Sequence, residues 1–405
     1  MDLIICGDAL KELKKLSENS VDSVITDPPA GISFMGNDWD KDKGGRDNWI
    51  NWLSKIMIEA IRVLKPGGHA LVWALPRTSH WTAFALENAG FEIRDCIYYI
   101  FGSGFPKSLD ISKAIDKHFN VERVVTGLKH PEYKDGIPGG KGFHNSLGRD
   151  GGERMEPEYK TVPTSAEAKQ WSGWGTGLKP AVECWWLCRK PLSEKTIVEN
   201  VLKWGTGGIN IDECRVETED VVGWGGSPSS GYAGGLDQKQ DARPVQGRFP
   251  ANLIHDGSDE VLEEFAKAGE KRSGKSNNNA DIGIYTKNAI TPMRRGKLIP
   301  RYDVGTASRF FYCAKASSKE RKEYNNHVTV KPLALMKYLI ALITPKNGII
   351  LDPFMGSGST GVAAKMLSFD FIGIEINPEY VEIAKKRIES VPKRRRKLSC
   401  SVTKL

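Results

Sequence analysis

The alternation of short apolar runs with helical patterns is the feature that most constrains how this chain can fold. Up to about Lys117 the apolar runs are LIICG, SVDSVIT, HALVWAL and FEIRDCIYYIFG, and each precedes a segment with helical periodicity. The alternation resumes at SRFFYCAK, with GIILD and FDFIGIE between further helical segments. Strands that alternate with helices form a mostly parallel sheet covered by helices on both faces. The sequence therefore predicts an α/β fold whose single sheet domain is divided into two parts.

A long irregular segment separates the two parts. Between residues 120 and 306 glycine and polar residues dominate, and stretches such as GWGGSPSSGYAGG carry turn and loop chemistry. We therefore expect four regions along the chain. They are 1–119, the first part of the sheet domain; 120–306, an irregular insertion; 307–390, the second part; and 391–405, a basic tail exposed to solvent.

Composition limits the class of protein without identifying it. The chain has 405 residues, of which 40% are hydrophobic and 27% are charged, as is typical of a globular protein. Its 58 basic and 50 acidic side chains give a net charge of +8, which permits a polyanionic partner but does not establish one. The start MDLIICGD lacks a basic signal-peptide region, and no apolar stretch approaches the roughly 18 residues of a membrane span. We therefore expect a cytoplasmic protein with no membrane partner.

The seven cysteines favour a reducing compartment. They are scattered along the chain, and only Cys184 and Cys188 lie close together, without a second pair at metal-binding spacing. We expect free thiols and predict neither a disulfide nor a metal site.

A glycine-rich loop joins a predicted strand to a predicted helix at LDPFMGSGSTG, from Leu351 to Gly361. Glycines there let a ligand approach the backbone amides at the start of the helix. The loop matches neither a Walker A motif nor a Gly-x-Gly-x-x-Gly dinucleotide site, so a phosphate ligand is disfavoured. The next strand ends at Glu375, whose carboxylate can accept hydrogen bonds from ribose hydroxyls. The pair favours a nucleoside without phosphates; the alternative is a tight turn with Glu375 as a helix cap.

Four short motifs lie at the ends of predicted strands or the starts of predicted helices. They are CGDAL with Asp8, DPPA at Asp27 to Ala30, TVKP at Thr329 to Pro332, and DPFMGSG at Asp352 to Gly358, which Glu375 follows. In this combination and order they resemble the S-adenosylmethionine-dependent DNA amino-methyltransferases, in the permuted arrangement called the β group. The resemblance covers residues 2–117 and 309–388 and implies a Rossmann-like methyltransferase fold.

The resemblance assigns a role to each motif. The residues that it implies in catalysis are Asp27, Pro28, Pro29 and Ala30. The residues that it implies in binding the cofactor, S-adenosyl-L-methionine, are Asp8, Lys331, Asp352, Pro353, Phe354, Gly356, Ser357, Gly358 and Glu375. Residues 1–119 then form the catalytic half, residues 307–390 the cofactor-binding half, and residues 120–306 a target-recognition region.

Partners also follow from the resemblance. The expected substrate is double-stranded DNA, methylated at specific sites, and a cognate restriction nuclease is a candidate partner. The state of assembly is left open between a monomer and a homodimer. The segments FGSGFPKSLDISKAIDK, GTGLKP, RFPANLI and RFFYCAK further resemble phage- or prophage-type members.

The DPPA motif suits methyl transfer to an exocyclic amine, which is a poor nucleophile because its lone pair is delocalised into the ring. Asp27 can accept one amine hydrogen, and the Pro28 carbonyl, held by the rigid Pro-Pro geometry, can accept the other. Such a reaction is a direct displacement, so it needs neither a covalent enzyme intermediate nor a metal. A base in duplex DNA must be flipped out to reach the site, at a cost of roughly a few kcal/mol.

The sequence departs from the family pattern at Ala30, where members usually carry an aromatic residue that stacks on the flipped base. Base–aromatic stacking is worth about 1–3 kcal/mol by substitution, so another ring is expected in this role. Phe34, Trp39 and Trp73 are the candidates, and each has the alternative of a core or loop anchor. We favour Trp39, because the GNDWD segment favours a turn back toward the site.

Several alternatives stay open. Family habit links Asp-Pro-Pro with adenine N6, which we favour over cytosine N4. The further alternatives are a methyltransferase acting on RNA or on protein glutamine, and a DNA-binding relative that has lost catalysis. Trp185 and Trp186 are expected to anchor a strand in the core. The residues expected on the DNA side are Trp171, Trp174, Arg294, Arg295 and Lys297.

Overall fold

The computed structural model describes residues 2–33, 36, 38–104, 108–128, 159–223, 244–272, 304–315 and 330–392. It forms two compact units, one made of Met1–Gly102 with Val182–Leu405 and the other of Ser103–Ala181. No helix in these described ranges is long and apolar enough to cross a membrane.

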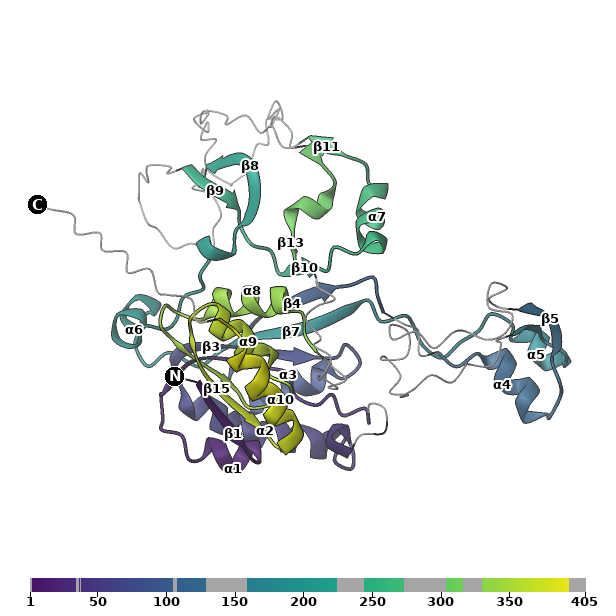
Figure 1. The fold of residues 1–405 in the computed structure, drawn as a ribbon, viewed down its shortest axis with the longest axis horizontal. Coiled ribbons are helices and arrows are strands. Elements are labelled where there is room, and N and C mark those ends of the chain that lie inside the picture. Colours follow the sequence, from purple (N-terminus) through teal and green to yellow (C-terminus); the bar gives the residue numbers. More distant parts are fainter. Residues whose placement is uncertain are drawn as a thin grey trace, which may run out of the picture. The chain divides into compact units, whose positions relative to one another are not determined.

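A nine-stranded sheet is the centre of the larger unit (Figure 1). Its strands in spatial order are β1 (Asp2–Cys6), β15 (Asp370–Glu375), β14 (Ile349–Asp352), β2 (Val21–Thr26), β3 (Leu64–Ala74), β7 (Val182–Arg189), β4 (Glu92–Ile100), β10 (Leu253–His255) and β13 (Tyr312–Cys313). All neighbouring strands are parallel except β7, which is antiparallel to both β3 and β4. The predicted α/β fold with a mostly parallel sheet is confirmed.

Helices cover both faces of the sheet, because alternate strand residues are apolar on each side. One core combines α1 (Ala9–Leu13), α2 (Arg46–Val63) and α3 (Ser79–Asn88) with strand residues such as Val24 and Val72. The other combines α8 (Leu333–Ile343), α9 (Ser359–Met366) and α10 (Pro378–Glu389) with Ile25 and Leu71, which are next to Val24 and Val72 in the sequence and face the opposite side of the sheet. Strands buried on both faces are typical of parallel sheets.

The first and last strands of the chain are neighbours. β1 pairs with β15 in parallel register, with Cys6 opposite Glu375, and α10 packs against β1. The two parts of the sheet domain therefore close into one fold, as the permuted motif order requires.

β7 shows that part of the expected insertion belongs to the sheet. Trp185 is fully buried in the core and Trp186 donates its indole N–H to the Ser79 carbonyl at 3.1 Å, so both anchor this strand as predicted. Because β7 lies between β3 and β4, the compact units divide after Gly102 and Ala181, whereas the sequence placed its boundaries after residues 119 and 306.

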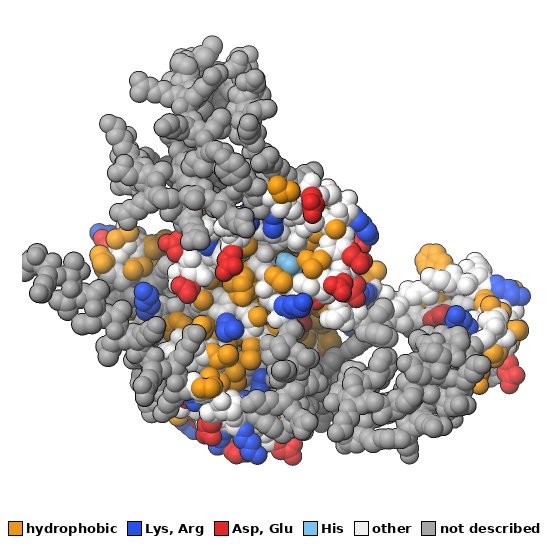
Figure 2. Space-filling model, turned by 45° about the horizontal axis from the view of Figure 1, so that its top comes forward, with side chains coloured by type: hydrophobic (Ala, Val, Ile, Leu, Met, Phe, Trp, Pro, Cys, Tyr) orange, Lys and Arg blue, Asp and Glu red, His pale blue; other side chains and the backbone are white. Residues whose placement is uncertain are grey.

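Smaller elements complete the larger unit. They are α6 (Ile197–Trp204), α7 (Asp259–Lys267), β8 (Val216–Gly223), β9 (Pro244–Arg248), β11 (Lys271–Arg272), β12 (Val304–Gly305) and three 3-10 turns, η2 (Asp38–Asp40), η4 (Asp212–Cys214) and η5 (Ala307–Phe310). On the face in Figure 2, Lys and Arg side chains are interspersed with Asp and Glu side chains wherever residues are described.

The smaller unit has a hairpin and two helices. β5 (Val124–Leu128) pairs with β6 (Tyr159–Val162), and α4 (Ile111–His118) packs against α5 (Ala166–Gln170). The buried Asp116 carboxylate joins them, because it accepts from Arg123 Nη1 at 2.7 Å and from Ser165 Oγ at 2.6 Å.

Candidate functional site

One edge of the sheet gathers the residues that the motifs single out. Because β1, β15, β14, β2 and β3 are parallel, their carboxyl ends meet at this edge. β7 runs the other way, so it brings its first residues, Val182 and Glu183, to the same edge. Asp27 follows β2, Asp352 ends β14 and Glu375 ends β15.

The segment after Asp27 is held in place from two sides. The Ala30 carbonyl accepts a hydrogen bond from Thr78 Oγ1 at 2.9 Å. The buried Asp40 carboxylate accepts from the Gly31 amide at 2.9 Å and from the Ile32 amide at 3.4 Å. A side chain at Gly31, whose φ is +72°, would meet the Trp49 ring at 2.7 Å. The turn therefore has one tightly defined path away from Asp27.

Asp27 lies in an environment that disfavours its charge. Burial raises its pKa to about 6, the Lys331 ammonium acts in the opposite direction, and Glu183 and Asp40 add to the rise. Lys331 Nζ lies 3.4 Å from Asp27 Oδ2, and a quarter of the Asp27 side chain, 25%, is exposed. A partly accessible carboxylate with a raised pKa can accept hydrogen bonds and take up a proton near neutral pH.

Lys331 stands between two carboxylates. Its ammonium donates to Glu183 Oε2 at 3.1 Å, and lies 3.9 Å from the centroid of the Trp73 ring. The Trp73 indole N–H donates to the same Glu183 oxygen at 2.8 Å. Burial acts to lower the pKa of Lys331, but Asp27 and Glu183 together raise it, so the lysine stays charged.

Glu183 is a site residue that sequence reasoning missed. It lies within the segment interpreted as an irregular insertion, where the apolar run VECWWLCR gave no sign of strand direction. An acid at the start of an apolar strand was the available signal, but only an antiparallel strand brings it to this edge.

Asp352 is buried and engaged within the protein. It accepts hydrogen bonds from Thr26 Oγ1 at 2.7 Å, from Thr360 Oγ1 at 2.6 Å and from the Phe354 amide at 3.1 Å. Burial raises its pKa to about 7, these three hydrogen bonds act against the rise, and Asp27 adds to it. Asp352 thus ties β2, β14 and α9 together beside Asp27.

Glu375 organises the glycine-rich loop. Its carboxylate accepts from the Gly356 amide at 2.9 Å and from the Asn377 amide at 2.8 Å, and burial raises its pKa against these hydrogen bonds. The helix cap of α10 is Asn377, whose side chain accepts from the Glu379 amide at 2.9 Å, and not Glu375 as the alternative interpretation expected. A carboxylate has about four acceptor sites, so the two bonds that Glu375 accepts leave capacity for ligand hydroxyls.

The glycines and Ser357 have a packing role as well. Gly358 has a φ of +81°, and a side chain there would meet Ala384 of α10 at 2.9 Å. Arg387, buried in α10, donates to the Ser357 carbonyl at 2.5 Å and to Ser357 Oγ at 2.8 Å. The loop is therefore fixed on α10 before any ligand is considered.

The remaining motif residues lie near the same edge. Asp8 follows β1 and caps α1 by accepting from the Lys11 amide at 3.0 Å. Phe354, after Pro353, has its ring centroid 5.7 Å from that of Trp52. Trp39 is partly exposed in η2, directly before Asp40.

The other residues that the sequence singled out lie either outside the described residues or in the smaller unit. Those outside the described residues are Phe34, Thr329, Arg294, Arg295 and Lys297. Trp171 and Trp174 are described in the smaller unit, where they are 40% and 61% exposed with ring centroids 5.0 Å apart.

The donor and acceptor set at the edge fits S-adenosylmethionine. Glu375 and Asp8 present carboxylates at the ends of adjacent strands, as ribose hydroxyls and an adenine amine require. No Lys or Arg lies between Asp352 and Thr360, where a phosphate-binding loop would place one. Among the described residues, no group of three His, Cys, Asp or Glu side chains is arranged to hold a metal ion.

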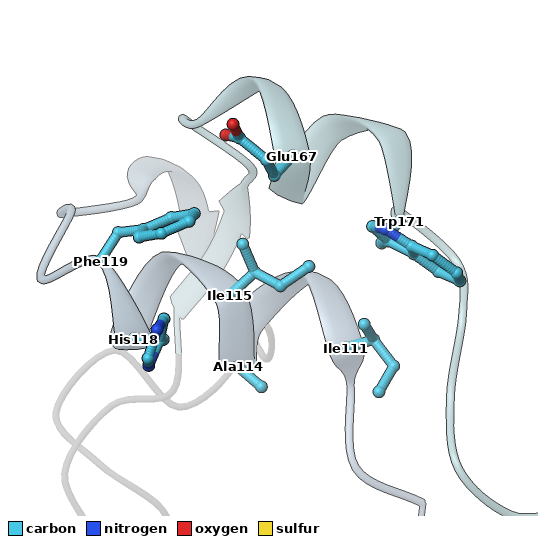
Figure 3. A pocket seen from close by; sticks show the side chains of 7 residues that line it. All are labelled: Ile111, Ala114, Ile115, His118, Phe119, Glu167 and Trp171. Atoms are coloured by element: carbon cyan, nitrogen blue, oxygen red, sulfur yellow. The ribbon is translucent and has the colours of Figure 1, made fainter.

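A separate groove lies in the smaller unit (Figure 3). α4 and the residue after it contribute Ile111, Ala114, Ile115, His118 and Phe119, and the other side is formed by Glu167 and Trp171. Its lining is mainly apolar and lacks the acceptors found at the sheet edge, so it is not the candidate site.

Comparison with known proteins finds similar type II methyltransferases. The type II methyltransferase M.HindIII of Haemophilus influenzae is 22% identical over 425 residues, which cover 96% of this chain and 95% of that protein. The type II methyltransferase M2.LlaDCHI of Lactococcus lactis subsp. cremoris is 39% identical over 92 residues, but these are 23% of this chain and only 34% of that relative. The crystal structure of an M1.HpyAVI–SAM complex aligns over 96% of this chain and 99% of that one, at 18% identity and a TM-score of 0.40.

A family model described as DNA methylase matches residues 21–120 and 167–386. The match includes the DPPA segment, Glu183, Lys331, the glycine-rich loop and Glu375. Since it covers well over half of the chain, the chain belongs to the DNA methylase family, the S-adenosylmethionine-dependent amino-methyltransferases of the adenine-N6 and cytosine-N4 type.

Proposed function

We propose that this protein methylates an exocyclic amine of a flipped base in duplex DNA, with adenine N6 as the favoured position. The observation that carries the proposal is the partly exposed Asp27 carboxylate with a raised pKa, which follows β2 at the sheet edge next to the glycine-rich loop and Glu375. The spatial order β15, β14, β2 supports the proposal, because Glu375, the glycine-rich loop and Asp27 then lie at the ends of neighbouring strands.

Asp27 and Pro28 act on the amine. The Asp27 carboxylate accepts one amine hydrogen and the Pro28 carbonyl accepts the other, so the nitrogen lone pair is drawn out of conjugation and toward the methyl group. When bound, S-adenosylmethionine supplies a sulfonium methyl group and is left as S-adenosylhomocysteine. As the nitrogen–carbon bond forms and the sulfur–carbon bond breaks, the amine loses one proton, which Asp27 can accept and pass to solvent. A pKa of about 6 suits this temporary role.

Glu375, Asp8 and the loop hold the cofactor in this proposal. Glu375 accepts from ribose hydroxyls, and Asp8 lies on the adenine side at the end of β1. Asp352, Pro353, Phe354, Gly356, Ser357 and Gly358 shape the loop beneath it. Asp352 and Arg387 support this arrangement, because their hydrogen bonds fix both ends of the loop.

Trp39 is our candidate for the aromatic face that Ala30 does not provide. Asp40, its neighbour, binds the amides of Gly31 and Ile32, so Trp39 belongs to the same turn as Ala30. Target recognition is proposed for residues 120–306, which include the exposed Trp171 and Trp174. Trp171 and Trp174 contribute to specificity in the proposal, whereas the sheet edge, to which β7 brings Glu183, contributes chemistry.

The proposal is tested by incubating the protein with methyl-labelled S-adenosylmethionine and, separately, duplex DNA, structured RNA or a protein extract. Label is expected in duplex DNA only, and Asp27→Ala is expected to lose the transfer while it retains cofactor binding. Label in RNA or protein would point to another member of the methyltransferase class. Cofactor and DNA binding without turnover would point to an inactive DNA-binding relative.

A further inference from the structure

Glu183 forms the centre of a charged cluster beside Asp27. Its Oε2 atom accepts both the Trp73 indole N–H at 2.8 Å and the Lys331 ammonium at 3.1 Å. The same ammonium lies 3.4 Å from Asp27 Oδ2, farther than from Glu183. Lys331 is only 11% exposed at its side chain, so it has little water to replace a lost partner.

Asp27 and Glu183 both lie close enough to the Lys331 ammonium to pair with it. Asp27 can use an oxygen to accept an amine hydrogen only if that oxygen is not fully committed to Lys331. Glu183 offers Lys331 a nearer acceptor, and the Trp73 ring, 3.9 Å from Nζ, offers a further favourable contact. Trp73 in turn fixes the Glu183 carboxylate through its indole N–H.

We propose that Glu183 is a positioning residue for methyl transfer: with Trp73 it holds the Lys331 ammonium away from Asp27, which keeps an Asp27 oxygen available to the amine. This inference rests on the proposed function and adds to it a residue on β7, outside the DPPA and glycine-loop motifs.

The charges around Asp27 define what the loss of Glu183 would do. The charged groups that act on Asp27 are Lys331 from the segment before α8, Glu183 from β7 and Asp40 from η2, and Asp27 in turn raises the pKa of Asp352 on β14. Glu183 raises the pKa of Asp27 and Lys331 lowers it. Without the Glu183 charge, Lys331 turns fully to Asp27, so the Asp27 pKa falls. The Asp27 carboxyl would then ionise more readily, but its oxygens would be less available to accept a hydrogen bond from the amine.

The test compares Glu183→Gln with the wild-type chain in two measurements. Glutamine retains an oxygen for the Trp73 indole N–H but removes the charge that attracts Lys331. The first measurement is the titration of the Asp27 carboxyl by carbon NMR of aspartate-labelled protein, assigned with Asp27→Asn. The midpoint is expected to move to lower pH in Glu183→Gln. This measurement needs neither cofactor nor turnover.

The second measurement is the pH profile of methyl transfer to duplex DNA. For Glu183→Gln we expect kcat to fall by about tenfold to a hundredfold with KM for DNA unchanged, because misplacing a reacting group by about 1 Å costs on the order of a hundredfold. The acid limb of kcat/KM is expected to move to lower pH together with the NMR midpoint. A structural defect would lower the rate without moving this limb.

Two variants separate charge from folding. Glu92→Gln, on β4, removes the carboxylate that accepts from Arg189 Nη2 at 2.6 Å, and Arg189 lies at the other end of β7 from Glu183. This variant is expected to leave both the Asp27 titration and the rate unchanged. Glu183→Asp keeps the charge on a shorter side chain, so it should restore much of the rate that glutamine loses.

An unchanged Asp27 midpoint in a folded Glu183→Gln protein would overturn the proposal, and so would a shifted midpoint with full kcat. Failure of the proposed function is recognised separately, because the wild-type chain itself would then transfer no methyl group to DNA.

Discussion

Asp27→Asn is expected to stabilise the folded chain at neutral pH while it abolishes methyl transfer. The Asp27 carboxyl has a pKa of about 6 in the folded chain, against 3.8 for an unperturbed aspartate. Its folded pKa is therefore raised, and burial is the main cause. A carboxyl of this kind favours folding when it is protonated, and this stabilisation is lost as pH rises from about 3.8 through about 6.

The magnitude follows from the difference between the two values. The pKa difference of about 2.2, at 1.36 kcal/mol for each pKa unit, gives an upper bound of roughly 3 kcal/mol for the free energy of unfolding that the charge on Asp27 costs at pH 8. Asparagine has no such charge, but it leaves Lys331 with Glu183 as its remaining acidic partner. We therefore expect Asp27→Asn to raise the free energy of unfolding by about 1–3 kcal/mol at pH 8.

Urea unfolding of both proteins at pH 4.5 and pH 8 is the assay. The gain of Asp27→Asn over the wild-type chain should fall to about a third of its pH 8 value at pH 4.5, where Asp27 is protonated in the folded chain but still mostly ionised in the unfolded one. A gain that is equal at both pH values, or a loss at pH 8, would refute the assignment of a raised pKa to Asp27. Ser172→Ala, at an exposed position outside the site, is the control and should leave the free energy of unfolding unchanged at both pH values.

Glu375→Ala is expected to weaken binding of S-adenosylmethionine by about 1–3 kcal/mol, because charge-assisted hydrogen bonds to ribose are lost; calorimetry that shows unchanged affinity would contradict this role. Trp39→Ala should lower methyl transfer to duplex DNA by about tenfold or more, equivalent to about 1.4 kcal/mol, with cofactor affinity retained. The parental rate in that variant would remove Trp39 from base stacking. Replacing residues 120–181, the part of the proposed target-recognition region that precedes β7, with the corresponding segment of a relative should change which DNA sites are methylated but not the base. Sequenced sites that stay the same would place recognition elsewhere.

Most of the sheet could be predicted from the sequence, because β1, β2, β3, β4, β14 and β15 each precede a helix of clear periodicity. β10 lies within the segment interpreted as an irregular insertion and was not predicted. Asp27 directly follows β2 and Asp352 is the last residue of β14, in agreement with the expectation that both motifs lie at the ends of strands. β7 was not predicted as part of this sheet, because an apolar run reports neither strand direction nor the partner with which it pairs. Its antiparallel position between β3 and β4 depends on contacts more than 80 residues apart in sequence.

The site was predictable to the same degree. Asp27, Asp352 and Glu375 are adjacent to strand ends, so local pattern was enough to bring them together. Glu183 reaches them only through the direction of β7, and Lys331 meets both carboxylates through the packing of α8. The close approach of α10 to Gly358 likewise depends on tertiary packing, which cannot be predicted from the presence of a glycine in a loop.

The mechanism that we propose is direct methyl transfer to an exocyclic amine, with the Asp27 carboxylate as the acceptor of a hydrogen bond from that amine. The most direct measurement is the identity of the methylated nucleoside, by mass spectrometry of duplex DNA digested after incubation with the protein and S-adenosylmethionine. We expect N6-methyladenine with the wild-type chain and no methylated nucleoside with Asp27→Ala. N4-methylcytosine would retain the amine chemistry but contradict the preference for adenine. Methylation at carbon 5 of cytosine, or an undiminished product with Asp27→Ala, would contradict the mechanism itself.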